Sequence, residues 1–199
     1  MSLILLGSTS GSCTLQEQAV AGSSVITLPV GTGTAVVNGV NGSLVSATAQ
    51  NSTSGTSIDF TGIPSWVKRV TVMFNGVSTN GASPLQVQIG SGSFTTSGYN
   101  GVVSYATTGV GTETRTTGLP VMQSATQSAE GAVYGLFFVA LQTGNTWVSS
   151  CTVAKTGTTN ATCFGGGSLA LGGTLDRIRI TTVNGTDTFD AGSINIMYE

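Results

Sequence analysis

The 199-residue sequence lacks histidine and has only 14 charged residues, six of them Lys or Arg and eight Asp or Glu. Without histidine, neither a Ser-His-Asp triad nor a Cys-His pair can form in its usual way. Catalysis by two carboxylates needs acids about 5 to 9.5 Å apart across a sugar. The late pair Asp187 and Asp190 lies in a turn-like segment, where capping of backbone amides is the simpler role and a calcium site with Asn184 is the alternative. The sequence therefore predicts a protein that is not an enzyme and needs no cofactor.

The few cations are scattered along the chain and form no dense basic stripe. Neutralisation of phosphates is the main source of affinity for nucleic acid, so we expect no nucleic-acid partner. Residues 3–6 are an apolar run without a basic flank, and no long hydrophobic stretch follows. We therefore expect neither a secretory signal nor insertion into a membrane.

Cysteine is scarce and occurs in an odd number: Cys13, Cys151 and Cys163. A mixed zinc site would need histidine, so we expect no metal site. Free thiols are the expected state, and a bridge between Cys151 and Cys163 across a hairpin is the alternative, since spacing alone does not give disulfide geometry.

Glycine and small hydroxyl residues are abundant instead, with 29 Gly, 32 Thr and 24 Ser. Six of the ten asparagines precede glycine, a pair typical of tight hairpin turns. Between these turns, apolar and polar residues alternate, as in half-buried strands: Leu85, Val87 and Ile89 alternate with Gln86 and Gln88. The same alternation places Ile178 and Ile180, Ile194 and Ile196, and Trp147, Cys151 and Val153 on inward faces.

The charged residues near the strands are expected to pair. Lys68 shares a strand face with apolar residues, so it lies either at the start of that strand or beside Asp59 or Asp176. Arg177 and Arg179 suit cross-strand or inter-subunit contacts, because the planar guanidinium binds a carboxylate with two hydrogen bonds.

One segment, residues 134–141, is apolar on both faces and must be covered on both sides. It is predicted to be either the central strand of a sandwich or a strand at a subunit contact. The candidate contact residues are Tyr134, Leu136, Phe137, Phe138, Val139 and Leu141.

These patterns predict an all-β fold: an antiparallel, jelly-roll-like β-sandwich over residues 55–199. Residues 1–54 contain no Trp, Tyr or Phe and cannot bury enough surface to fold alone. We expect them to form an extended N-terminal attachment arm.

Two stretches carry a resemblance to a known family. Residues 55–81, GTSIDFTGIPSWVKRVTVMFNGVSTNG, and residues 173–199, GTLDRIRITTVNGTDTFDAGSINIMYE, resemble the C-terminal β-domain of virion structural and fibre-type proteins of tailed bacteriophages. Residues 14–22 and 28–33 are similar to the strand-and-linker units near the start of phage tail-fibre proteins. The resemblance implies a β-rich virion domain, commonly trimeric, whose N-terminal part docks on the particle, and it names no catalytic residue.

The expected function is that of a structural component of a tailed phage, a homotrimeric fibre or tail-associated protein anchored by its arm to other virion proteins. The alternatives are a capsid decoration or head-fibre protein, and an adhesin that binds host surface polysaccharide through the loops 90–101 and 109–118. Tyr99 and Asn100 are the candidate receptor or partner residues. The expected location is the exterior of the virion, on tail or head, after synthesis in the bacterial cytoplasm.

Overall fold

The computed structural model describes residues 2–6, 12–16, 44–124, 129, 131–158 and 160–199. The chain divides into two compact units, Met1–Ala35 and Val36–Glu199. The described part of the first unit is an antiparallel pair of strands, β1 (Ser2–Leu6) and β2 (Ser12–Gln16). The second unit contains every other described strand.

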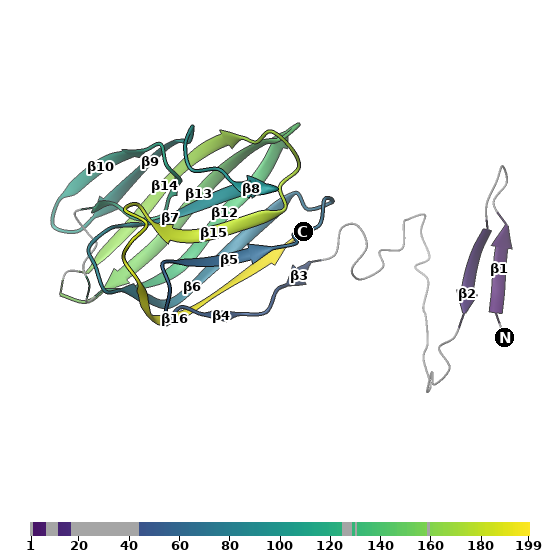
Figure 1. The fold of residues 1–199 in the computed structure, drawn as a ribbon, viewed down its shortest axis with the longest axis horizontal. Coiled ribbons are helices and arrows are strands. Elements are labelled where there is room, and N and C mark those ends of the chain that lie inside the picture. Colours follow the sequence, from purple (N-terminus) through teal and green to yellow (C-terminus); the bar gives the residue numbers. More distant parts are fainter. Residues whose placement is uncertain (1, 7–11, 17–43, 125–128, 130, 159) are drawn as a thin grey trace. The chain divides into compact units, whose positions relative to one another are not determined.

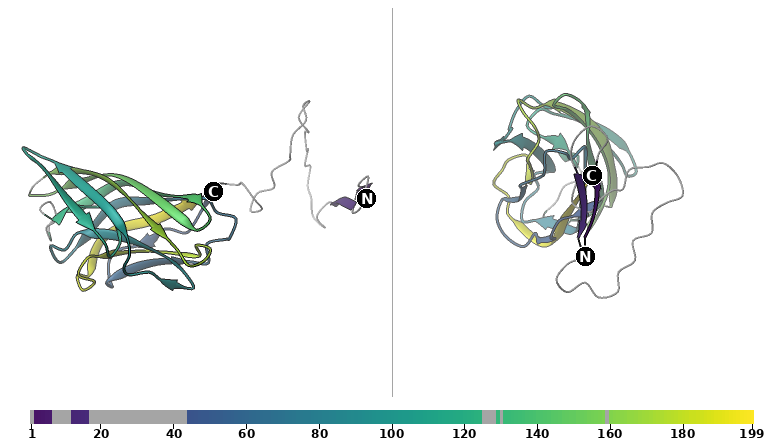
Figure 2. Two further views of the ribbon diagram at one scale, coloured as in Figure 1. Left: turned by 90° about the horizontal axis from the view of Figure 1, so that it is seen from above. Right: turned by 90° about the vertical axis from the view of Figure 1, so that its right-hand side faces the viewer.

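The second unit is built from two antiparallel sheets, which pack face to face (Figure 1) and are seen from two further sides in Figure 2. The prediction of an all-β antiparallel sandwich is confirmed. The large sheet has the order β10 (Val110–Arg115), β9 (Asn100–Ala106), β14 (Ala161–Ala170), β13 (Thr146–Thr156), β12 (Ala132–Thr143), β6 (Arg69–Thr79), β16 (Phe189–Tyr198) and β3 (Val45–Ser46), and β4 (Gln50–Asn51) also pairs with β16. The small sheet has the order β11 (Leu119–Pro120), β7 (Leu85–Ser91), β15 (Arg177–Thr182) and β5 (Ser57–Thr61), and β8 (Ser93–Phe94) pairs with β7.

A single core lies between the two sheets, and the alternation of residues predicts which side chains fill it. Leu85, Val87 and Ile89 are completely buried, as are Ile178 and Ile180 on the neighbouring strand. Burial of such side chains contributes about 25 cal/mol per Å² of apolar area. From the large sheet the core receives, among others, Val70, Val72, Phe74, Phe137, Val139, Trp147, Cys151, Val153, Ile194 and Ile196.

The boundary predicted for the arm has to be corrected. β3 and β4 fall within residues 1–54, yet both pair with β16, where Val45 lies opposite Tyr198 and Gln50 opposite Ile194. Ser52 is also completely buried, and its hydroxyl donates a hydrogen bond of 2.8 Å to the Ala191 carbonyl. These two-residue strands are too short to show an alternating pattern, so only the pairing with β16 identifies them. Most of the remaining predicted arm lies outside the described residues.

A β-bulge in β6 lies beside Gly135 of β12. From Val133 to Gly135 the partner on β6 moves from Val77 to Phe74, so β6 has the extra residue. Gly135 itself has a φ of 135°, which other residues rarely adopt. A Cβ atom here would lie 2.6 Å from the Thr152 carbonyl oxygen. Backbone conformation and close packing therefore both require glycine at this position.

For Cys151, Cys163 and Lys68 the structure decides between the alternatives that the sequence leaves open. Cys151 and Cys163 are buried thiols that are not joined in a disulfide. Lys68 is exposed, directly before the first residue of β6. Asp59 and Asp176 pair with arginines instead. No helix among the described residues has the length and apolar character needed to cross a membrane.

Candidate functional site

The outer face of the large sheet carries a cluster of exposed apolar side chains. Register places Phe138, Ser150, Gly166 and Val102 in one row across β12, β13, β14 and β9. The next row contains Leu136, Thr152, Phe164 and Ser104. Exposed fractions in this cluster run from 36% for Phe138 to 76% for Val110. We call it the outer apolar face, and it comprises Val102, Val110, Tyr134, Leu136, Phe138, Val148 and Phe164.

The outer apolar face carries no charged side chain among the described residues of β10, β9, β14, β13 and β12. The outward positions between its apolar members are Ser, Thr, Ala or Gly. The nearest ion pair on this side, Arg69 with Glu199, lies at the end of β6. With about 4.8 Å between strands and about 3.3 Å per residue, five strands over about six residues cover on the order of 500 Å². This lies in the upper part of the range for the largest apolar patch of a typical monomer, about 300–600 Å², and such a patch is often functional.

The structure divides the predicted contact segment into two faces. Tyr134, Leu136 and Phe138 belong to the outer apolar face. Phe137 and Val139 are completely buried between the sheets, and Leu141 packs against the same core, so the prediction that these three contact another subunit is wrong. The reason is the two-residue period of a strand: β12 lies between β13 and β6, and every second side chain points into the sandwich.

Tyr99, predicted to be an accessible receptor residue, is a core residue with 3% exposure. Its hydroxyl accepts a hydrogen bond of 2.9 Å from the Ile89 N–H and donates one of 2.8 Å to the Thr95 carbonyl. Burial raises the pKa of Tyr99 to about 12, although the hydrogen bond to Ile89 opposes the shift. The prediction for Tyr99 is therefore wrong: its flanking glycines suggest a loop, but the ring anchors that loop to β7. Asn100 is exposed.

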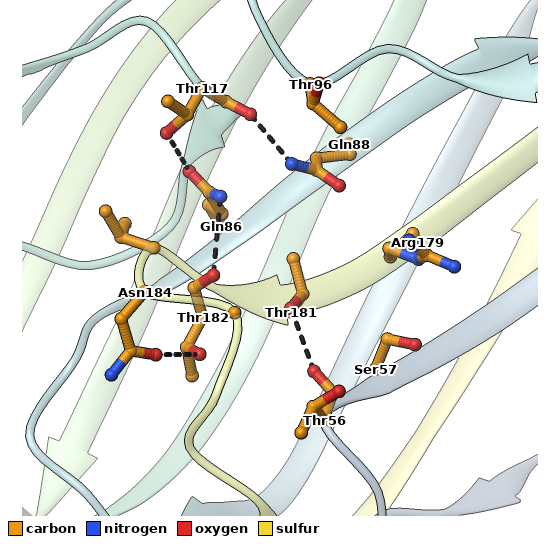
Figure 3. Close-up of a pocket in the computed structure, with 12 residues that line it drawn as sticks. Thr56, Ser57, Gln86, Gln88, Thr96, Thr117, Arg179, Thr181, Thr182 and Asn184 are labelled. Atoms are coloured by element: carbon orange, nitrogen blue, oxygen red, sulfur yellow. Dashed lines mark hydrogen bonds between the residues drawn. The ribbon is translucent and has the colours of Figure 1, made fainter.

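A polar pocket of about 310 Å³ lies on the outer face of the small sheet (Figure 3). Two cross-strand rows form its floor. In one row Gln88 lies opposite Arg179 of β15, and in the other Gln86 lies opposite Thr181 and Thr181 opposite Ser57. Gln86 and Gln88 are only 2% and 6% exposed, because the loops that contain Thr96 and Thr117 lie beside them. We call this the small-sheet pocket.

Hydrogen bonds hold the two glutamines in place. The Gln88 side-chain amide donates a hydrogen bond of 2.9 Å to the Thr117 carbonyl. The Thr117 hydroxyl in turn donates a hydrogen bond of 2.9 Å to the Gln86 side-chain oxygen. The Gln86 amide donates at 3.4 Å to the Thr182 carbonyl. Figure 3 shows both glutamine side chains turned toward Thr117 above the β7 and β15 strands. These hydrogen bonds therefore hold the floor of the pocket in one conformation in the absence of a ligand.

Arg179 is the one cation among the described residues that line the small-sheet pocket, and it is paired. Arg179 makes two hydrogen bonds with Asp59 and lies with its guanidinium carbon 4.1 Å from the centre of the Phe94 ring. Hydrogen bonding to Asp59 raises the pKa of Arg179. The neighbouring Arg177 pairs with Asp176. The described lining of the pocket is therefore polar, and the charge of its one arginine is neutralised by Asp59.

Of the two late aspartates, Asp187 has the predicted capping role and Asp190 does not. Asp187 accepts a hydrogen bond of 2.9 Å from the Ser83 N–H and one of 2.6 Å from the Asn184 side chain. Asp190 lies in β16 and accepts a hydrogen bond from the Ser78 hydroxyl, not from a backbone amide. Within the described ranges, no three residues of the types His, Cys, Asp and Glu are grouped so that they could hold a metal ion.

The sequence patterns do not reveal the small-sheet pocket. Alternation predicts that Gln86 and Gln88 point away from the core, but not that loop residues Thr96 and Thr117 stand beside them. These two residues belong to the loops 90–101 and 109–118 that the sequence suggests for ligand binding. The only available signal was the occurrence of two alternating glutamines in a chain whose outward positions are mostly Ser and Thr.

Comparison with known proteins finds no matching family model, no matching curated protein and no matching solved structure. A function for this chain has to be inferred from its own structure, namely from the outer apolar face and the small-sheet pocket.

Proposed function

We propose that this protein is a structural component of a tailed-bacteriophage particle and associates with copies of itself through the outer apolar face. The observation that carries the proposal is the placement of seven exposed apolar side chains on one sheet face. The eighth large exposed apolar side chain among the described residues, Leu44, precedes β3. An apolar patch of about 300–600 Å² is often a functional surface, and contact with a partner would remove it from water.

The energetics favour association through this face. Its area, on the order of 500 Å², is more than half of the roughly 800 Å² that each partner contributes to a standard-size specific interface. Aromatic residues are enriched among those that dominate binding energy, and Tyr134, Phe138 and Phe164 lie on neighbouring strands. Since no charged side chain among the described residues of β10, β9, β14, β13 and β12 lies in this face, association incurs no charge desolvation there.

The assembly is a homotrimer on the exterior of the virion, and the N-terminal residues attach it to other virion proteins. Two observations support this part of the proposal. Residues 55–81 and 173–199 resemble fibre-type virion domains, which are commonly trimeric. The chain also divides into a small N-terminal unit and the sandwich, as expected when one part attaches and the other projects. A fibre or tail-associated position is preferred, and capsid decoration or a head fibre is the alternative.

The first experiment measures mass in solution. Sedimentation equilibrium of the full chain is expected to give three times the monomer mass of 19.9 kDa at micromolar concentration. Phe138→Glu places a charge in the middle of the outer apolar face, and we expect it to weaken association at least 100-fold, because an unpaired buried carboxylate is strongly unfavourable. The matched control is Thr53→Glu, an exposed position in the loop after β4.

Two results would overturn the proposal. One is a wild-type chain that stays monomeric at micromolar concentration. The other is equal weakening by Phe138→Glu and Thr53→Glu, which would exclude the outer apolar face as the contact. Location is tested separately by a reconstruction of the particle, in which density for the sandwich on the tail or on the head decides between fibre and decoration protein.

A further inference from the structure

The small-sheet pocket is a second surface that self-association through the other sheet does not use. Its floor consists of side chains from β7, β15 and β5, and its rim includes Thr96 and Thr117 from two separate loops. Its volume of about 310 Å³ is at the small end of the range for ligand sites, about 300–1,000 Å³. We propose that this pocket binds one unit of a neutral saccharide.

Several groups in the pocket are available to a ligand. Among the described residues, none hydrogen-bonds the Gln88 side-chain oxygen, the Ser57 hydroxyl or the Nη1 group of Arg179. They are an acceptor, a group that both donates and accepts, and a donor. A sugar ring carries several hydroxyls that donate and accept at neighbouring positions, so it can satisfy all three kinds of group together.

The charge balance selects a neutral ligand. Asp59 already uses two hydrogen bonds to neutralise Arg179, at 2.8 and 2.7 Å, and Asp176 does the same for Arg177. An anionic ligand would have to compete with both carboxylates. A cation would find no free carboxylate among the residues that line the pocket.

The lining also disfavours an apolar ligand. Val183 is the one aliphatic side chain among the described lining residues, and a ligand without polar groups would leave the amides and hydroxyls of the floor without water or partner. Such unsatisfied polar groups are costly. The existing contacts of Gln86 and Gln88 with Thr117 and Thr182 hold the floor in one conformation, which lowers the entropy lost on binding.

The test uses the full-length protein labelled with ¹⁵N and titrated with the methyl glycosides of glucose, galactose, mannose and N-acetylglucosamine. The side-chain amide signals of Gln86 and Gln88 report on the pocket directly, and substitution of each glutamine assigns its signal. We expect at least one glycoside to shift both signals saturably, with a dissociation constant of about 1–10 mM, which is ordinary for a single small polar ligand. Glucuronate, the charged counterpart of glucose, is expected to bind no more tightly than the best glycoside.

Gln88→Leu keeps the approximate size of the side chain and removes its amide, and it is expected to weaken binding about tenfold or more. Gln142→Leu is the matched control, since Gln142 is exposed on β12 of the other sheet, and it is expected to leave binding unchanged. The idea is overturned if no glycoside shifts the two amide signals, if glucuronate binds more tightly than every glycoside, or if Gln88→Leu binds like the wild type. Should Gln88→Leu fail to fold, the wild-type titration decides. Mass is measured on the same samples, so loss of sugar binding and loss of self-association are separate results.

Discussion

Arg179 and Asp59 lie directly opposite each other on β15 and β5 and form a two-pronged ion pair. Nε of Arg179 donates to Oδ1 of Asp59 at 2.8 Å, and Nη2 donates to Oδ2 at 2.7 Å. The two side chains are 30% and 32% exposed, which is intermediate between a surface pair and a buried one. This pair borders the small-sheet pocket and links the edge strand of the small sheet to its neighbour.

A double-mutant cycle measures the strength of that pair. Asp59→Asn, Arg179→Gln and the double variant are unfolded with denaturant, and we expect a coupling free energy of about 0.5–1 kcal/mol, because partial exposure to solvent weakens the attraction. The same cycle on Asp176 and Arg177, which are neighbours in sequence, is the control and should give a smaller coupling. A coupling near zero for Asp59 and Arg179 would contradict the two-pronged geometry.

Glu113 should make stability depend on pH in the acid range. Partial burial by itself raises the pKa of Glu113, but hydrogen bonds from the N–H and hydroxyl of Ser124 and from Arg115 outweigh it and lower the pKa. A lowered pKa in the folded state adds stability above the ordinary Glu value of about 4.3, and this stability is lost as pH falls through the folded pKa.

Glu113→Gln tests this prediction. At pH 7 the variant should lose about 1–3 kcal/mol of unfolding free energy, because Arg115 is buried and loses its charged partner. The difference from wild type should begin to shrink as pH falls below about 4.3 and should be lost below the lowered pKa of the folded state, where Glu113 of the wild type is neutral as well. A difference that stays constant from pH 7 to the acid range would refute the assignment.

Tyr99 should act as a structural anchor and not as a binding residue. Tyr99→Phe removes the hydroxyl that joins the Ile89 N–H to the Thr95 carbonyl, and we expect a loss of about 1–2 kcal/mol in denaturant unfolding. Tyr99→Ala also leaves a cavity and should cost about 3–5 kcal/mol. If Tyr99→Phe is as stable as wild type, the two hydrogen bonds contribute nothing measurable.

The ionisation of Tyr99 provides an independent measurement. The difference in ultraviolet absorbance between wild type and Tyr99→Phe should show a step near pH 12 instead of the ordinary value of about 10. Because the pKa is raised in the folded state, stability is full below pH 10 and declines as pH rises toward 12. A step near 10 would indicate a solvent-exposed ring.

Cys151 should be unreactive in the folded protein. Its burial, reinforced by the nearby Cys163, raises the pKa of its thiol to about 12, and the thiol lies 3.8 Å from the Val121 carbonyl oxygen. In a Cys13→Ser background, a thiol reagent at pH 8 should label native protein at least about 100-fold more slowly than protein in denaturant, since labelling requires local opening. Equal rates would show that the two buried cysteines are accessible.

Local patterns predict much of the fold. Alternation at 85–89, 178–180 and 194–196 identifies the inward side chains correctly, because a strand that separates a core from solvent must alternate. Local patterns do not predict β3 and β4, since a strand of two residues is recognised only by its pairing with another strand. They do not predict the burial of Tyr99 either, because glycine and asparagine next to an aromatic residue indicate a loop but not whether the ring points to the core or to solvent.

The class of structure follows from local patterns in the sequence: alternating strands and Asn-Gly turns predict an antiparallel β-sandwich. The composition of the surfaces depends on the tertiary structure. Strand order brings Phe138, Phe164 and Val102 together from three strands, and it brings Gln88 next to Arg179 and two loops. Periodicity along one strand tells which side chains share a face, but only the pairing between strands distant in sequence tells which residues become neighbours there.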